Sequence, residues 1–137
     1  MAQRSLRFDV PVGPQAPGEA RHRVVTCLRE WGFGGSGWLD SVAVVVSEVV
    51  TNAVQHGGDG PLIAVALDVQ AARVALSVAD SSAVAPRRRE PDDRGGRGLL
   101  LLDALTDRWY VADDGDGKRV HVEFRRAEVT PGQEEAK

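Results

Sequence analysis

The sequence predicts an α+β two-layer sandwich, in which a mixed, mainly antiparallel sheet is covered on one face by about three helices. The expected elements follow one another as strand, helix, helix, strand, strand, helix, strand, strand. This order contains too few helices, too closely clustered, for a doubly wound parallel sheet. A length of 137 residues suits a single domain. We assign residues 1–127 to that domain and residues 128–137 to a polar tail.

Hydrophobic periodicity predicts the first three elements. Residues 6–10 alternate between apolar and charged side chains, which is typical of a half-buried strand. A connector rich in proline and glycine at residues 11–17 precedes a helix at residues 19–31. A longer helix is expected at residues 38–56. The β-branched run at residues 42–46 would also suit a strand, but the length of the segment and the glycines after His56 favour a helix.

The second half predicts two hairpins separated by a long loop and a short helix. Residues 62–69 and 73–79 form the first pair of strands, and the second of these alternates cleanly. Residues 83–98 are polar and rich in proline, arginine and aspartate, which is typical of a lid or binding loop. A short apolar helix is expected at residues 99–105. Strands at residues 109–112 and 120–124 complete the sheet around an aspartate- and glycine-rich turn.

Composition argues against several classes of function. The net charge of −3 provides no global basic field for nucleic acid or a membrane surface. No apolar run approaches the roughly 20 residues that span a bilayer, and the first residues lack the apolar stretch of a secretory signal. The single cysteine, Cys27, cannot form an internal disulfide, and its apolar neighbours predict a small buried side chain. We therefore expect a cytoplasmic protein.

Glu48, Asn52 and His56 follow one another at four-residue spacing in the longer helix. An α-helix turns 100° per residue, so this spacing forms one slanted row on a single face. A carboxamide oxygen suits Mg²⁺, which also binds substrate phosphates, and a carboxylate one turn away can accept a proton from an attacking hydroxyl. The alternative is an ordinary polar face that meets solvent. His56 alone also suits a helix end, where it would contact the last carbonyl groups.

Two further segments could contribute to a binding site. Asp80 ends an alternating strand, where its carboxylate could accept a hydrogen bond from an exocyclic amine or simply stabilise a turn. Glycines at residues 95, 96 and 98 precede the helix expected from Leu99. Glycines before a helix expose backbone N–H groups at its positive end, which is an anion site. The alternative is a flexible loop that ends in a helix.

The ordered set of a Glu-x-x-x-Asn helix, an aspartate at a strand end and a Gly-Arg-Gly-Leu segment after a lid resembles the ATP-binding domain of the GHKL superfamily. The resemblance covers nearly the whole chain and implies the Bergerat fold of histidine-kinase-like ATPases. Within this superfamily, the size of the chain and the segment at residues 48–56 are similar to the bacterial anti-sigma-factor serine/threonine-protein kinases.

The resemblance implies a role for each residue of the set. Glu48 would be the catalytic base that activates an acceptor hydroxyl. Asn52 would bind Mg²⁺ and the phosphates of ATP, and His56 would lie at the rim of the nucleotide pocket. Asp80 would bind the adenine amine. The phosphates would meet the segment Gly96, Arg97, Gly98 and Leu99.

The resemblance also implies a function. The chain would be an ATP-dependent kinase that binds a sigma factor in one state and phosphorylates an anti-anti-sigma antagonist in another, with no direct nucleic acid or membrane contact. Homodimerisation would be possible through the strand at residues 6–10. However, residues 81–86 lack the glycines that usually follow the aspartate. The alternative is therefore a catalytically weak or inactive ATP-binding, or nucleotide-free, interaction module that sequesters a regulatory partner.

Overall fold

The fold was analysed in a computed structural model, which describes residues 4–56, 60–70, 73–80, 94–114 and 117–125. In chain order the elements are β1 (Arg4–Pro11), α1 (Ala16–Glu30), α2 (Ser36–His56), β2 (Leu62–Gln70), β3 (Arg73–Asp80), α3 (Arg94–Leu105), β4 (Arg108–Asp114) and β5 (Gly117–Arg125).

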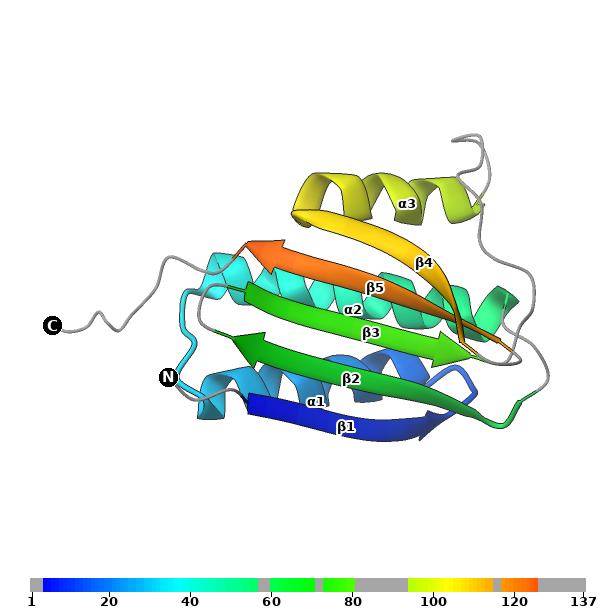
Figure 1. The fold of residues 1–137 in the computed structure, drawn as a ribbon, viewed down its shortest axis with the longest axis horizontal. Coiled ribbons are helices and arrows are strands. Elements are labelled where there is room, and N and C mark those ends of the chain that lie inside the picture. The colour runs from blue at the N-terminus through cyan, green and yellow to red at the C-terminus, as the bar shows by residue number, and fades with distance from the viewer. Residues whose placement is uncertain (1–3, 57–59, 71–72, 81–93, 115–116, 126–137) are drawn as a thin grey trace, which may run out of the picture.

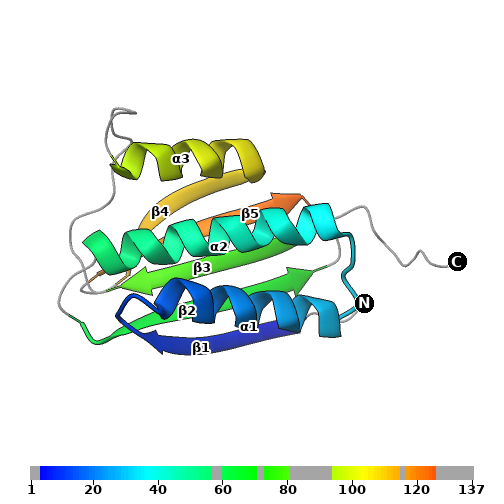
Figure 2. The ribbon, with the colours of Figure 1, turned by 180° about the vertical axis from the view of Figure 1, so that it is seen from behind.

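The five strands form one sheet in the order β1-β2-β3-β5-β4, and every neighbouring pair is antiparallel. The ribbon seen from the two sides places the helices on one face of this sheet (Figures 1 and 2). The predicted sandwich class is therefore confirmed. The only departure is that the described sheet is wholly antiparallel, because each strand pairs through a hairpin or a returning connection.

Helix α2 supplies much of the core. Its fully buried or nearly buried valines lie at positions i, i+3, i+4, i+7 and i+8, and they are Val42, Val45, Val46, Val49 and Val50. This spacing forms one continuous apolar stripe on a helix, whereas a strand would send neighbouring valines to opposite faces. The periodicity therefore outweighs the low helix propensity of valine, and the helix prediction for this segment is confirmed.

By length and composition alone, part of α2 could also span a membrane. Gly37–His56 has a mean hydropathy of 1.3 over its most apolar window, contrary to the expectation that no segment approaches this test. In the fold, however, its valine stripe is buried among the other core residues. A core helix passes the same test, so the segment is weak support for a membrane span.

All three helices begin earlier than predicted, and α2 does so by two residues, at Ser36 rather than at residue 38. Helix α1 begins at Ala16 rather than at residue 19, with a proline in its first turn, where proline needs no N–H partner. Helix α3 begins at Arg94 rather than at Leu99, so the expectation of a loop over residues 94–98 was wrong. Glycine costs about 1 kcal/mol per residue in a helix interior, which is why the local sequence favoured a loop there. The rest of the predicted lid lies outside the described residues.

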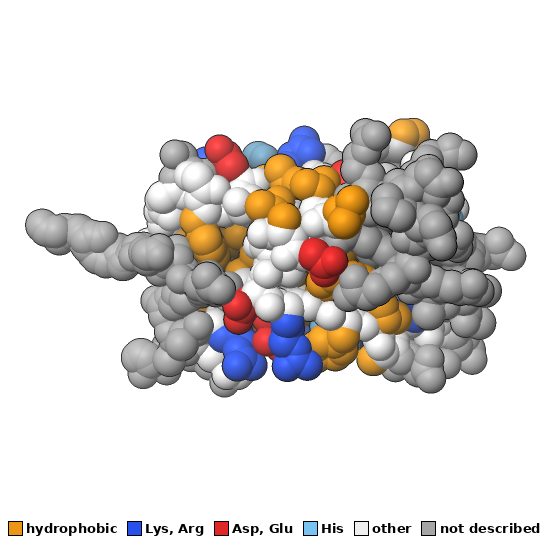
Figure 3. All heavy atoms as spheres, turned by 90° about the horizontal axis from the view of Figure 1, so that it is seen from above, with side chains coloured by type: hydrophobic (Ala, Val, Ile, Leu, Met, Phe, Trp, Pro, Cys, Tyr) orange, Lys and Arg blue, Asp and Glu red, His pale blue; other side chains and the backbone are white. Residues whose placement is uncertain are grey.

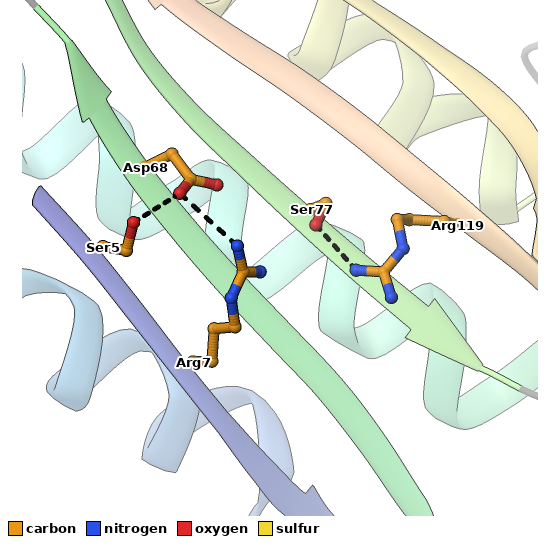
Figure 4. Close-up of polar contacts among 5 residues, drawn as sticks. All are labelled: Ser5, Arg7, Asp68, Ser77 and Arg119. Carbon is orange, nitrogen blue, oxygen red and sulfur yellow. Dashed lines mark hydrogen bonds and ion pairs between the residues drawn. The ribbon is translucent and has the colours of Figure 1, made fainter. Parts of the chain in front are cut away.

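The sheet face opposite the helices carries polar side chains (Figure 4). The Ser5 hydroxyl donates to Asp68 at 2.8 Å, and Arg7 pairs with the same carboxylate at 3.7 Å. Further along this face, Arg119 donates to the Ser77 hydroxyl at 2.8 Å. These cross-strand contacts occupy non-core positions of the pleat, so the two faces of the sheet separate polar from apolar side chains as the alternation predicted.

The edge formed by α3 and β4 shows hydrophobic side chains at the surface (Figure 3). Among the described residues, Leu100 is 55% exposed and Tyr110 is 38% exposed. Tyr110 stacks on His121, with ring centroids 4.7 Å apart, and the Arg108 guanidinium lies 4.8 Å from the Tyr110 ring. Single exposed apolar residues of this kind are common, and they do not by themselves indicate a partner.

Cys27 lies on α1 and is only half-buried, not fully buried as predicted. Burial raises the pKa of its thiol above the ordinary value; the nearby Glu30 carboxylate raises it further, whereas Arg4 lowers it. The reactive form of cysteine is the thiolate, so a raised pKa reduces reactivity at neutral pH.

Two leucines on β2 provide a matched test of the core. Leu67 is fully buried, whereas Leu62, on the same strand, is 49% exposed. We expect Leu67→Ala to lower the free energy of unfolding by about 2–5 kcal/mol, because it removes buried methyl groups and leaves a cavity. Leu62→Ala should change it by about 0.5 kcal/mol or less. Urea denaturation followed by circular dichroism measures both; equal losses would contradict the assigned orientation of β2.

Candidate functional site

One pocket of the molecule lies between the C-terminal half of α2 and the inner face of the sheet. From α2, its wall is formed by Val49, Asn52, Ala53 and His56. These residues follow the i, i+3, i+4, i+7 spacing of a single helix face. Asn52 is half-buried and His56, at the end of the helix, is exposed. The predicted carboxamide therefore lies in the pocket wall, and the predicted imidazole lies at a position suited to its rim.

Glu48 lies one turn before Asn52 and is half-buried, but it does not belong to the described wall of this pocket. The reason is the slant of the predicted row. Four residues turn the helix by about 400°, so each step of the row rotates by about 40° around the axis. Asn52 and His56 therefore line the pocket, whereas the Glu48 position is rotated around the helix axis, away from the pocket wall. A catalytic role for Glu48 stays a prediction.

The sheet contributes an ion pair to the opposite wall. Asp80 ends β3, and its directly paired neighbour on β5 is Lys118. The Lys118 Nζ atom donates to both carboxylate oxygens of Asp80, at 2.9 Å and 3.1 Å. Only 5% of the Lys118 side chain and 6% of the Asp80 side chain are exposed. Asp80 therefore lies in the wall of the pocket as one half of a buried ion pair, and adenine binding by Asp80 stays a prediction.

Sequence reasoning missed Lys118, although the strand pattern contains a signal for it. Lys118 has the same parity on β5 as Val120, Val122 and Phe124. Val122 and Phe124 are buried in the core. Since alternate residues of a strand point to the same face, a lysine in this series faces the inside of the sandwich. A buried lysine needs a charged partner, so this parity alone could have indicated a polar site.

Helix α3 and strand β4 close the remaining described wall through Leu102 and Trp109. Leu102 is 1% exposed. The Trp109 indole donates to the Asp103 carboxylate at 2.7 Å, which links β4 to α3. The wall beside the ion pair is therefore largely apolar. Val78 and Val120 form it from the sheet, together with Leu102 and Trp109.

The start of α3 at Arg94 changes the predicted phosphate segment. In an α-helix only the first few backbone N–H groups lack an internal acceptor. Because α3 begins at Arg94, the backbone N–H group of Gly96 has no acceptor within the helix. The N–H groups of Arg97, Gly98 and Leu99 lie at positions that donate to the carbonyl group four residues earlier. The proposed helix tip therefore lies at residues 94–96 rather than at Leu99. Phosphate contact by any of these four residues stays a prediction.

The polar groups of the pocket fit a nucleotide, although its described space is small. An amide, an imidazole and a carboxylate–ammonium pair converge on it among apolar walls, which is the usual make-up of a small-molecule site. Its cavity volume is about 20 Å³, little more than one water molecule needs. Residues 81–93 lie outside the described part of the chain.

Residues 10–124 match the family of histidine kinase-like ATPase domains. The chain belongs to this family. Membership in an ATPase domain family implies ATP binding. No curated protein matches the chain.

Two solved structures share the fold. One is that of the RsbU and RsbW domains of Rv1364c from Mycobacterium tuberculosis, with a TM-score of 0.68 and 22% identity; the match covers 89% of this chain and 32% of that one. The other is the histidine kinase domain of the blue-light activated histidine kinase EL346 from Erythrobacter litoralis, with a TM-score of 0.53 and 21% identity. That match covers 85% of this chain and 61% of that one. The chain thus spans less than two thirds of either structure.

The buried ion pair predicts a specific pattern of stability. We expect Lys118→Met to lower the free energy of unfolding by about 3–5 kcal/mol, because it leaves the Asp80 carboxylate buried without its ammonium partner. The double variant Asp80→Leu with Lys118→Met should recover most of that loss, since two apolar side chains need no pairing.

The control is the Arg7–Asp68 pair on the outer face, where the arginine side chain is 67% exposed. Arg7→Met should cost less than about 1 kcal/mol, because water solvates the carboxylate that remains. Urea denaturation measures all three variants. A loss for Lys118→Met as small as that for Arg7→Met would show that the Asp80 carboxylate is not buried.

Proposed function

We propose that this domain is an ATP-dependent regulatory protein kinase of the anti-sigma-factor type. It binds Mg·ATP in the pocket between α2 and the sheet. It transfers the terminal phosphate to the hydroxyl group of a serine or threonine of an anti-anti-sigma antagonist and releases ADP. In its other state it binds a sigma factor, and it acts in the cytoplasm. The observation that carries the nucleotide part is the convergence of Asn52 from α2 and Asp80 from β3 on one pocket.

The pocket residues support distinct tasks. In the proposed complex the Asp80 carboxylate accepts a hydrogen bond from the adenine amine, which fixes the orientation of the base. The Asn52 carboxamide, on the α2 side of the pocket, would hold the metal and the phosphates. The described residues contain no cluster of three or more histidine, cysteine, aspartate or glutamate side chains that could hold a metal by themselves. Asn52 would hold Mg²⁺ together with the phosphates of the nucleotide, and the ion would supply neutralisation of the phosphate charge.

Glu48 is positioned beside the pocket, one helical turn before Asn52. In the proposed reaction its carboxylate accepts the proton of the incoming hydroxyl as the phosphate is transferred. A residue at the side of a nucleotide pocket can contact the protein substrate without contacting the base. The backbone N–H groups at the start of α3 donate hydrogen bonds to the phosphate oxygens in this proposal.

The choice of partners rests on two supports. The segment at residues 48–56 resembles that of the anti-sigma-factor kinases. The fold also resembles a structure that includes an RsbW domain, which is consistent with regulation by partner switching.

A second candidate function is a nucleotide-free interaction module that sequesters a regulatory partner. The cavity volume of about 20 Å³ favours this candidate, because a nucleotide needs far more space. Titration calorimetry with Mg·ATP separates the two candidates: heat of binding with a 1:1 ratio supports the kinase, and the absence of any binding at millimolar nucleotide supports the module.

Asn52→Ala tests the metal and phosphate site. We expect it to weaken Mg·ATP binding roughly tenfold or more, because a charge-assisted contact is worth about 1.5–3 kcal/mol. Gln55→Ala is the matched control, since it removes a carboxamide from the same helix at an exposed position outside the pocket wall. Calorimetry measures both affinities. If the two variants bind equally well, Asn52 does not contact the nucleotide or its metal.

Glu48→Gln tests the proposed base. We expect phosphotransfer to a serine-containing antagonist to fall by about 10²–10⁴-fold, because general-base catalysis contributes that much. ATP affinity should stay within about twofold, since Glu48 does not line the pocket. Glu30→Gln, at an exposed position on α1, is the control. Transfer of radiolabelled phosphate measures the rate, and an unchanged rate in Glu48→Gln would remove this role.

A further inference from the structure

Lys118 is the one charged residue classed as buried among the described residues, with 4% of its surface exposed. It projects from the start of β5 into the pocket beside Asp80. Folding alone does not require a lysine here, because replacing a buried ion pair with packed apolar residues is often neutral or stabilising. Its position in the pocket suggests instead a contact with the ligand.

The hydrogen-bonding capacity of the pair supports such a contact. A lysine ammonium has three N–H donors. Two contacts of Lys118 reach the two oxygens of Asp80, and the described part of the chain offers its third donor no other acceptor. A carboxylate provides about four lone-pair sites, more than the two contacts with Lys118 use, so Asp80 can accept from several donors at once. One wall of the pocket thus presents a hydrogen-bond donor directly beside an acceptor.

This arrangement matches the edge of adenine that carries its amine. The exocyclic amine is a donor, and the adjacent ring nitrogen N1 is an acceptor. Proteins recognise bases by pairing such groups along the Watson–Crick edge. We infer that Lys118 is a base-recognition residue, which donates a hydrogen bond to N1 of adenine while Asp80 accepts one from the adjacent amine. This inference rests on the proposed ATP binding and extends it to a residue of β5.

The first test uses the unaltered protein and two nucleotides. In 1-deaza-ATP a C–H group replaces N1, while the amine and the phosphates remain. Titration calorimetry should find Mg·1-deaza-ATP bound about tenfold or more weakly than Mg·ATP, because the base then leaves a buried ammonium donor unpaired. Equal affinity for the two nucleotides would overturn the role of Lys118 and leave the proposed ATP binding intact. Failure of both to bind would overturn the proposed function together with this inference.

The second test assigns the N1 contact to Lys118. Lys118→Met keeps a side chain of similar length without any donor. It should bind ATP about tenfold or more weakly than the unaltered protein and should no longer distinguish ATP from 1-deaza-ATP. If Lys118→Met keeps the full preference for ATP, another group contacts N1 and the inference is wrong. Should this variant fail to fold, the comparison of the two nucleotides on the unaltered protein still decides the question.

Arg119→Met is the matched control. It removes a cationic side chain from the next residue of β5, which contacts Ser77 on the opposite face of the sheet. Its preference for ATP over 1-deaza-ATP should equal that of the unaltered protein. If Arg119→Met also binds ATP with a reduced preference over 1-deaza-ATP, the loss in Lys118→Met reflects a general disturbance of β5. That result would overturn the specific contact between Lys118 and N1.

Discussion

The packing of α2 against the sheet is the constraint on which the site depends. Its valine stripe, represented by Val45 and Val49, must be buried against the inner face of the sheet. Burying these side chains stabilises the fold by about 1.5–3 kcal/mol each and leaves one helix rotation favoured over the others. That rotation in turn directs Asn52 and Ala53 toward the end of β3. The polar groups of the pocket are thus positioned by apolar contacts a turn or two away.

The second constraint is the pairing of strand ends. Asp80 and Lys118 are direct neighbours across β3 and β5, on the face that also carries Val78 and Val120. A one-residue slip of β5 against β3 would turn Lys118 to the polar outer face and leave Asp80 on the inner face without its partner. The register is held by buried partners further along the strands, such as Leu76 with Val122. The core therefore fixes not only where the ion pair lies but also that it lies inside.

The sequence predicted the architecture well because its signals were periodic. The alternation in β3 and the helical spacing in α2 repeat over several residues, and each repeat adds information. The predicted start of α3 was wrong because glycines locally disfavour a helix. Whether residues 94–98 are helical depends on tertiary packing, which the local sequence does not show. Lys118 was missed because it belongs to none of the motifs in the sequence. A lysine is ordinarily exposed, and its burial follows only from the parity of a strand whose inner face is known.

The buried ion pair also connects stability to binding. When a ligand with its own donor and acceptor enters beside such a pair, the hydrogen bonds exchange partners and none of the polar groups needs to become unsatisfied. A pocket with a single buried carboxylate would lack this property, because its charge would be unpaired whenever the ligand was absent. Lys118 therefore supplies a partner for the buried Asp80 carboxylate from within the protein itself. A small cavity accords with this arrangement, since apolar residues such as Leu102 and Trp109 line the pocket beside a pair whose charges already contact each other.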